Sequence, residues 1–136
     1  NQGKVRWMID TGKMNAALFI VFLTRLIAGA TKKVFLIVDH LSVHEAAAVD
    51  EWLAGKTDRI EVFSLPKYAP ERNPDEYLNC DVKANINTDG LPADREELRE
   101  KLHRFMQRLA KLPARIASYF EHKYIAYAAA PELNPT

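Results

Sequence analysis

The acidic residue Asp39 is the first candidate for chemistry, because of where it falls in the sequence. It directly follows the apolar run Val34–Val38, and in parallel sheets ligands collect at the carboxyl ends of the strands. A carboxylate held rigidly at such an edge meets the requirement for a ligand of a divalent metal ion. The competing interpretation is an acid that only ends a strand or caps the next helix, and Asp39 by itself does not decide between them.

Glu76 carries the second carboxylate of interest, and it has the same ambiguity. In Asn73-Pro74-Asp75-Glu76, Asn73 can cap a helix, Pro74 can occupy its first position, and Glu76 can reach back to the Asn73 amide. That capping arrangement requires no chemistry. The alternative is a metal ligand in the first turn of the helix, with 36 residues between it and Asp39.

Alternating strand and helix patterns are expected to position these two residues. Three segments have the composition of strands, namely residues 4–9, 33–39 and 59–65. Five segments carry apolar residues at helical spacing, namely residues 15–28, 43–53, 73–87, 93–111 and 113–128. The middle strand is a continuous apolar run, which is typical of a central strand buried on both faces. A right-handed crossover would make Val34–Val38 and Ile60–Ser64 parallel neighbours, so the fold class is α/β.

The composition indicates one soluble domain over residues 1–130, with a disordered tail over residues 131–136. The formal charge of +1 gives no global reason to expect a polyanionic partner. A lone Cys80 excludes an internal disulfide framework and favours the reducing cytoplasm. The longest apolar stretch, Ala16–Leu23, is too short to span a membrane. Because the chain opens on Asn1-Gln2-Gly3 without an initiator Met, we expect a segment of a longer protein.

Three segments together resemble one protein family. LPKYAPERNPDEYLN, residues 65–79, resembles the LPxYxPxxNPxE signature of DDE transposases related to mariner. VFLIVDHLSVH, residues 34–44, resembles the strand of that family's second carboxylate, with Asp39, His40 and His44 at the matching positions. The opening NQGKVRWMIDTGKMNAALFIVFLTRLI also resembles this family, and the 36 residues between Asp39 and Glu76 are near its usual spacing. The resemblance to mariner-related insertion-sequence transposases covers nearly the whole chain.

The resemblance implies an RNase H-like fold with an incomplete mixed sheet, flanking helices and additional C-terminal helices. It implies DNA transposition, in which two metal ions support phosphodiester cleavage and strand transfer. Asp39 would bridge both ions and Glu76 would bind one, and all-oxygen ligands suit Mg²⁺ or Mn²⁺. The family pattern selects Glu76 rather than Asp75 as the ligand, and Asn73 supports it from the same motif.

Basic and polar residues near these positions are candidates for contacts with DNA. Lys67, Arg72 and Lys83 flank the expected site and could neutralise phosphates, although ordinary solvated charge is an equal alternative. His44 could orient the substrate or a metal-bound water, or it could be a structural hydrogen-bonding residue.

One departure from the family pattern leaves open whether this chain acts as an enzyme by itself. The family's first Asp lies on a strand that precedes everything present here, and Asp10 does not match its context. We therefore expect one catalytic carboxylate and two strands to be missing. The resulting apolar strand edge invites pairing with another chain, which predicts a homodimer.

Two other functions compete with a strand-transferring nuclease. In one, a truncated transposase-derived scaffold dimerises through its exposed strand edges and has no catalytic activity. In the other, a small α/β signalling or binding domain has Asp39 as an unrelated acid at the end of a strand, and Glu76 has no role.

Overall fold

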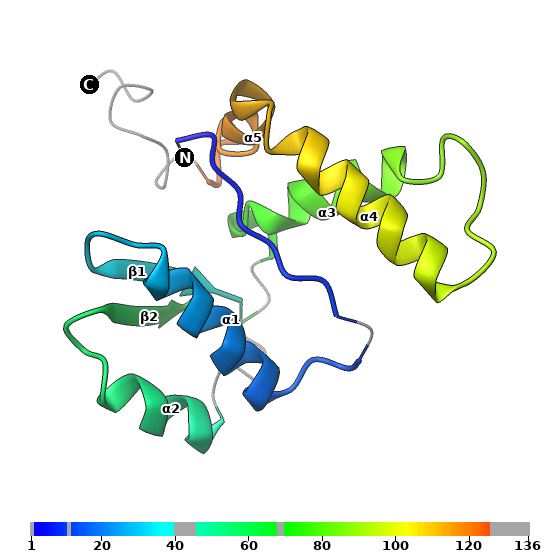
Figure 1. The fold of residues 1–136 in the computed structure, drawn as a ribbon. Helices are drawn as coiled ribbons and strands as arrows, with labels where there is room; N and C mark the ends of the chain where they lie inside the picture. Colours follow the sequence, from blue (N-terminus) through cyan, green and yellow to red (C-terminus); the bar gives the residue numbers. More distant parts are fainter. Residues whose placement is uncertain (1, 11, 40–45, 68–69, 126–136) are drawn as a thin grey trace. The chain divides into compact units, whose positions relative to one another are not determined.

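The computed structural model describes residues 2–10, 12–39, 46–67 and 70–125 (Figure 1). The chain divides into two compact units. The sheet unit is Gly12–Ala69, and the helical unit combines Asn1–Thr11 with Pro70–Thr136. The single domain expected over residues 1–130 stays a prediction.

The sheet unit contains helix α1 (Ala16–Ala28), strand β1 (Val34–Val38), helix α2 (Ala47–Ala54) and strand β2 (Ile60–Ser64). The two strands pair in parallel, from Val34 opposite Ile60 to Val38 opposite Ser64. This pairing confirms the prediction of parallel neighbours joined through a helix. Residues 40–45, where α2 was expected to start, lie outside the described residues.

Polar contacts define both ends of α1. At its start, the Asn15 Oδ1 atom accepts a hydrogen bond of 2.9 Å from the Leu18 amide. At its end, the Arg59 guanidinium donates to the Ile27 carbonyl at 2.8 Å and to the Ala30 carbonyl at 3.4 Å. The last carbonyls of a helix lack partners within the helix, so Arg59 both satisfies them and ties α1 to the start of β2.

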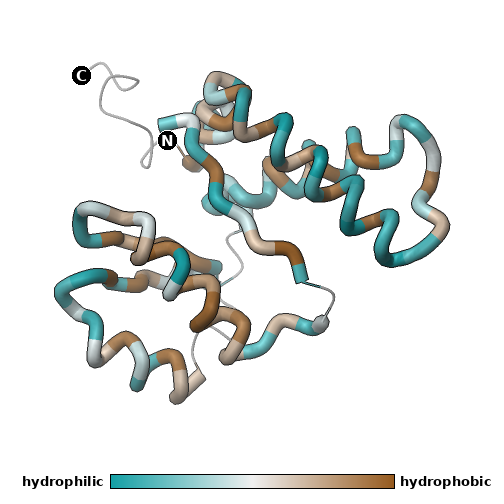
Figure 2. The backbone as a smooth tube through the Cα atoms, viewed as in Figure 1, coloured by the Kyte–Doolittle hydropathy of each residue, from teal (hydrophilic) through white to brown (hydrophobic). Residues whose placement is uncertain are grey.

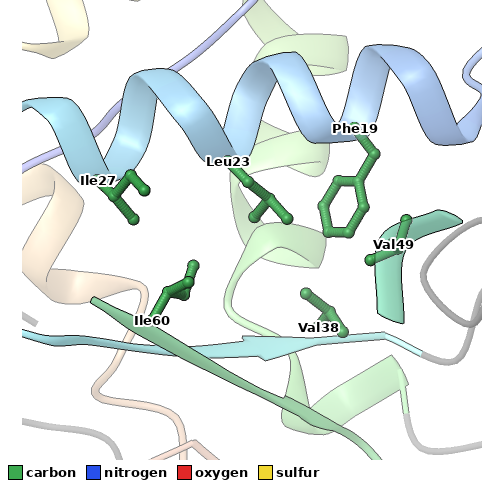
Figure 3. Close-up of a cluster of buried hydrophobic side chains, with 6 residues drawn as sticks. All are labelled: Phe19, Leu23, Ile27, Val38, Val49 and Ile60. Atoms are coloured by element: carbon green, nitrogen blue, oxygen red, sulfur yellow. The ribbon is translucent and has the colours of Figure 1, made fainter. Parts of the chain in front are cut away.

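One hydrophobic cluster holds the sheet unit together (Figure 3). Side chains from α1 point at the strands and at α2, and the cluster consists of Phe19, Leu23, Ile27, Val38, Val49 and Ile60. Leu23 and Val49 are fully buried. Burying a side chain such as Leu23 contributes about 1.5–3 kcal/mol, so this cluster is the main source of stability for the strand that precedes Asp39.

The expectation that β1 is buried on both faces is wrong for this structure. Phe35 and Ile37 are 63% and 46% exposed, and Phe63 on β2 is 47% exposed. The cause is strand alternation, since Val34, Leu36 and Val38 face the cluster under α1 and the residues between them face the other way. Among the described residues the sheet has two strands, and helices of its unit cover one of its faces (Figure 3).

The helical unit contains the short 3₁₀ helix η2 (Pro70–Arg72) and helices α3 (Asp75–Asn85), α4 (Arg95–Leu109) and α5 (Pro113–Ser118). Figure 2 shows hydrophobic positions recurring along the mainly hydrophilic helix α4, as expected for a helix with one buried stripe. The hydrophobic cluster of this unit consists of Phe105, Met106, Leu109 and Ile116, with Leu78, Val82 and Tyr119 packed against them.

The strand expected over residues 4–9 does not form. This segment has no regular secondary structure, and Val5 and Trp7 pack against the cluster of α4 and α5. Gly3 approaches α5 so closely that a Cβ atom would lie 2.5 Å from the Pro113 carbonyl oxygen. Val5 and Trp7, which helped to predict a strand, are therefore partly buried against helices, and such packing does not require a backbone ladder.

The C-terminal helix is shorter than expected. α5 ends at Ser118 rather than near residue 128, because the hydrogen bonds tighten to i→i+3 at Tyr119, Phe120 and Glu121. The predicted disordered tail lies outside the described residues. No described helix has the length and apolar character that a membrane span requires.

Candidate metal centre

Asp39 lies where the sequence predicted it, at the carboxyl end of β1. It follows the buried Val38, and the Val38 carbonyl accepts a hydrogen bond of 2.7 Å from the Leu65 amide just after β2. Asp39 is half-buried. The two strand ends are thus held together beside this carboxylate, as the argument from parallel sheets requires. His40 and His44 lie outside the described residues.

Glu76 lies in the first turn of α3, which Asn73 holds in place. The Asn73 Oδ1 atom accepts a hydrogen bond of 3.1 Å from the Asp75 amide, and the Asn73 carbonyl accepts one of 3.1 Å from the Glu76 amide. The prediction of Asn73 as the N-cap is wrong, because the helix begins at Asp75 and its N-cap is Pro74, which makes no side-chain cap bond. Asn73 instead restrains the turn before the helix through its bond from the Asp75 amide. The amide of Asn73 donates to the Pro70 carbonyl at 3.0 Å.

The bond from the Asn73 amide to the Pro70 carbonyl argues against a capping role for Glu76. A capping box would have required the Glu76 side chain to bind the Asn73 amide, yet that amide is bonded to Pro70. The Glu76 side chain is exposed. Its carboxylate is therefore presented to solvent from the start of a helix, where it can accept a cation.

A polar network on the same helix was not predicted from the sequence. The Asp81 carboxylate accepts hydrogen bonds from Arg115 Nε at 2.8 Å, from Arg115 Nη2 and from the Tyr119 hydroxyl. Asn85, one turn along α3, donates to the same carboxylate at 2.8 Å. These bonds tie α3 to α5 and the turn after it. Only the spacing of Asp81 and Asn85 was visible in the sequence, because the other partners lie more than 30 positions away.

The network shifts the pKa values of its members. Hydrogen bonds from Arg115 lower the pKa of Asp81, against a smaller opposing effect of burial. Burial, followed by the hydrogen bond to Asp81, raises the pKa of Tyr119 to about 12. The hydrogen bond to Asp81 raises the pKa of Arg115. Asp81 is therefore a charged structural acid with its oxygens occupied, unlike the exposed Glu76 of the same helix.

The sequence segment that contains both carboxylates matches a known family. The model of the DDE superfamily endonuclease family matches residues 1–99, most of this 136-residue chain. The chain belongs to this family. Neither the curated proteins nor the solved structures contain a match. Membership in the DDE superfamily endonucleases supports a transposase or nuclease role in DNA recombination, with DNA as the substrate and a divalent metal as the usual cofactor.

The matched range of this DDE endonuclease includes the elements that carry both candidate ligands, β1 with Asp39 and α3 with Glu76. Asp39 belongs to the sheet unit and Glu76 to the helical unit, so their convergence on one site stays a prediction. Within the ranges that the structure describes, no group of three or more His, Cys, Asp or Glu side chains could hold a metal ion. Carboxylate oxygens are nevertheless the donors that Mg²⁺ and Mn²⁺ prefer.

The predicted DNA-binding residues of the endonuclease are divided between the units. Lys67 follows β2 in the sheet unit, whereas Arg72 ends η2 and Lys83 lies in the last turn of α3. All three are exposed. Lys83 is seven residues after Glu76, which places the two on the same side of α3.

Proposed function

We propose that this chain is part of the catalytic domain of a mariner-related insertion-sequence transposase. The complete domain, of RNase H-like fold, cleaves DNA phosphodiester bonds and transfers strands. The observation that carries the proposal is the family match, which extends over both strands and the helix that bear Asp39 and Glu76. The motif that contains Asn73 and Glu76 supports the assignment to mariner-related members.

Asp39 and Glu76 are the proposed metal ligands. The buried strand β1 restrains the position of Asp39, and the turn held by Asn73 restrains Glu76. Two Mg²⁺ or Mn²⁺ ions bound there would activate the attacking water or 3′-hydroxyl and stabilise the leaving oxygen. The chain itself supplies two negatively charged carboxylates, Asp39 after β1 and Glu76 on α3, each held by its own element.

Basic residues complete the proposed site. Lys67, Arg72 and Lys83 are exposed cations that neutralise phosphates of the bound strand. His44 is a supporting residue of the site, because it matches the family motif. The lone Cys80 suits action in a reducing compartment such as the cytoplasm.

Calorimetric titration with Mn²⁺ tests the metal site without requiring activity. Wild type is expected to bind Mn²⁺ saturably, and Asp39→Ala and Glu76→Ala are each expected to abolish that binding, because one ion site needs both carboxylates. Asp75→Ala is the matched control, since it removes the neighbouring exposed acid whose side chain points about 100° away on the helix. Binding that survives either ligand substitution, or that depends equally on Asp75, would contradict the assignment.

A non-catalytic scaffold is the second candidate. The observation that favours it is the uncovered face of the sheet, where Phe35, Ile37 and Phe63 are about half exposed or more. Each of the two strands also has one unpaired edge among the described residues, and such edges favour pairing with a second copy. A truncated, transposase-derived scaffold of this kind would form a homodimer and would bind no Mn²⁺ in the titration.

A further inference from the structure

Three rings and a lysine lie in a row that begins in the first turn of α3. The ring centre of Tyr77, the residue after Glu76, lies 5.0 Å from that of His122 with an interplanar angle of 36°. His122 in turn lies 5.8 Å from Tyr124 at 31°. The Lys123 Nζ atom lies 4.7 Å from the Tyr124 ring centre. The row therefore joins the first turn of α3 to a segment more than 40 residues away.

The segment from His122 to Tyr124 is a turn whose side chains face solvent. The Ile125 amide donates to the His122 carbonyl at 2.8 Å, and the Ile125 side chain is fully buried. His122 and Lys123 are exposed, and Tyr124 is 45% exposed. Burial of Ile125 anchors the turn, so its three preceding side chains are held outward without contributing to the core.

Proteins bind unpaired nucleotides through aromatic side chains that lie beside a cation. Every base has a π-face that stacks on Tyr or His, and a nearby cation binds the phosphate. A structural role explains this row poorly, because the α3–α5 contact is already made by Asp81, Arg115 and Tyr119. The turn also lies outside residues 1–99, the range that the family comparison matches.

We propose that Tyr77, His122 and Tyr124 form a stacking site for an unpaired base of the DNA strand next to Glu76, with Lys123 on the adjoining phosphate. In taking DNA as the ligand, the inference rests on the proposed function. The Lys123 side chain is flexible and leaves the Tyr124 ring for the phosphate when a base occupies the row. A strand held here would enter the region of Glu76 with its bases separated from their partners.

Binding of a short single-stranded oligonucleotide that contains 2-aminopurine tests the site in the full chain. The titration is made in EDTA, so that it depends on neither metal nor cleavage. Tyr124→Ala and His122→Ala are each expected to weaken binding about tenfold, the effect of losing one stacking partner. Tyr124→Phe keeps the ring and is expected to bind like wild type. The same oligonucleotide as a blunt duplex is expected to bind at least tenfold more weakly, about 1.4 kcal/mol.

Matched controls separate this proposal from others. Phe63→Ala removes an exposed ring from the sheet unit and is expected to leave single-strand binding unchanged. This titration contains EDTA, whereas the calorimetric titration contains Mn²⁺ and no DNA, so a failed metal site and a failed stacking site give different results. Circular dichroism confirms that each variant is folded. Equal affinity of wild type, Tyr124→Ala and His122→Ala, or equal affinity for single strand and duplex, would overturn the proposal.

Discussion

Two acids on α3 differ in what surrounds them, and this difference separates a structural residue from a candidate ligand. Asp81 accepts bonds from Arg115, Tyr119 and Asn85, which stabilise its charge and occupy its oxygens. Glu76 is exposed, and its alternative partner, the Asn73 amide, is bonded elsewhere. The number of acids on a helix is therefore a poor guide to metal binding, and the hydrogen bonds already made by each acid are a better one.

Tyr119→Phe is expected to make stability less dependent on alkaline pH. The pKa of Tyr119 is raised from 10.0 to about 12, so its contribution to the free energy of unfolding is complete below pH 10 and is lost as pH rises from 10 to 12. Wild type should lose up to about 2 kcal/mol over this window through this group. Urea unfolding at pH 8, 10 and 12 measures the difference from Tyr119→Phe, which lacks the titrating hydroxyl.

Two comparisons check the assignment of this effect. Tyr124→Phe, outside the Asp81 network, should retain the alkaline loss shown by wild type. On the acid side the sign reverses, because the pKa of Asp81 is lowered from 3.8. Its contribution is complete above pH 3.8 and is lost at lower pH, and Asp81→Asn should lack that loss. Identical pH profiles for wild type, Asp81→Asn and Tyr119→Phe would show that the network contributes nothing.

At the scale of elements, strands β1 and β2 carry apolar side chains on both faces of the sheet, one packed and one exposed. Val34, Leu36 and Val38 pack under α1, while Phe35 and Ile37 remain exposed. The Phe35 and Phe63 rings stack at 6.5 Å, beside an ion pair of 3.2 Å between Lys33 and Glu61. An apolar face of this kind is available to associate with another surface.

Phe35→Ser is expected to reduce self-association of the chain without a large loss of stability. The Phe35 side chain is 63% exposed, so its removal leaves no cavity, whereas it takes apolar area from the uncovered face of the sheet. Sedimentation velocity at several protein concentrations measures the change. Val21→Ser, which alters a 42% exposed residue on α1, is the control and should associate like wild type. Equal association of both variants and wild type would contradict a role for this face.

At the scale of the whole molecule, the residues that the structure describes form two hydrophobic clusters with no residue in common. One joins α1, α2 and the strands, and the other joins α4 and α5 with α3 and with residues near the N-terminus. Local stability follows the packing of each cooperative unit. The two candidate ligands, Asp39 and Glu76, therefore depend on different cores.

Hydrogen exchange should report two separable cores. Leu23→Ala deletes a fully buried side chain, typically at a cost of about 2–5 kcal/mol, and should speed exchange of the amides of α1, β1 and β2. Phe105→Ala should do the same for α4 and α5. Each substitution is expected to leave protection in the other unit nearly unchanged. A uniform loss of protection in either variant would instead indicate the single cooperative domain that composition suggested.

Sequence periodicity was sufficient for the elements whose signal is local. Helices α1 and α4 and the parallel pair β1–β2 agree with prediction, because side-chain spacing and chain length determine them. The placement of Asp39 at a strand end and of Glu76 in a first helical turn followed for the same reason.

Only the tertiary structure decided what depends on distant partners. Residues 4–9 include β-branched and aromatic residues and resemble a strand. Whether such a segment pairs with a sheet or packs on helices depends on its neighbours in the folded chain. The bonds of Asp81 to Arg115 and Tyr119, and the contact between the Tyr77 and His122 rings, join residues 34 to 45 positions apart. Burial and side-chain contact are properties of the folded chain. Local sequence patterns therefore determine the helices and strands, but not these contacts between distant residues.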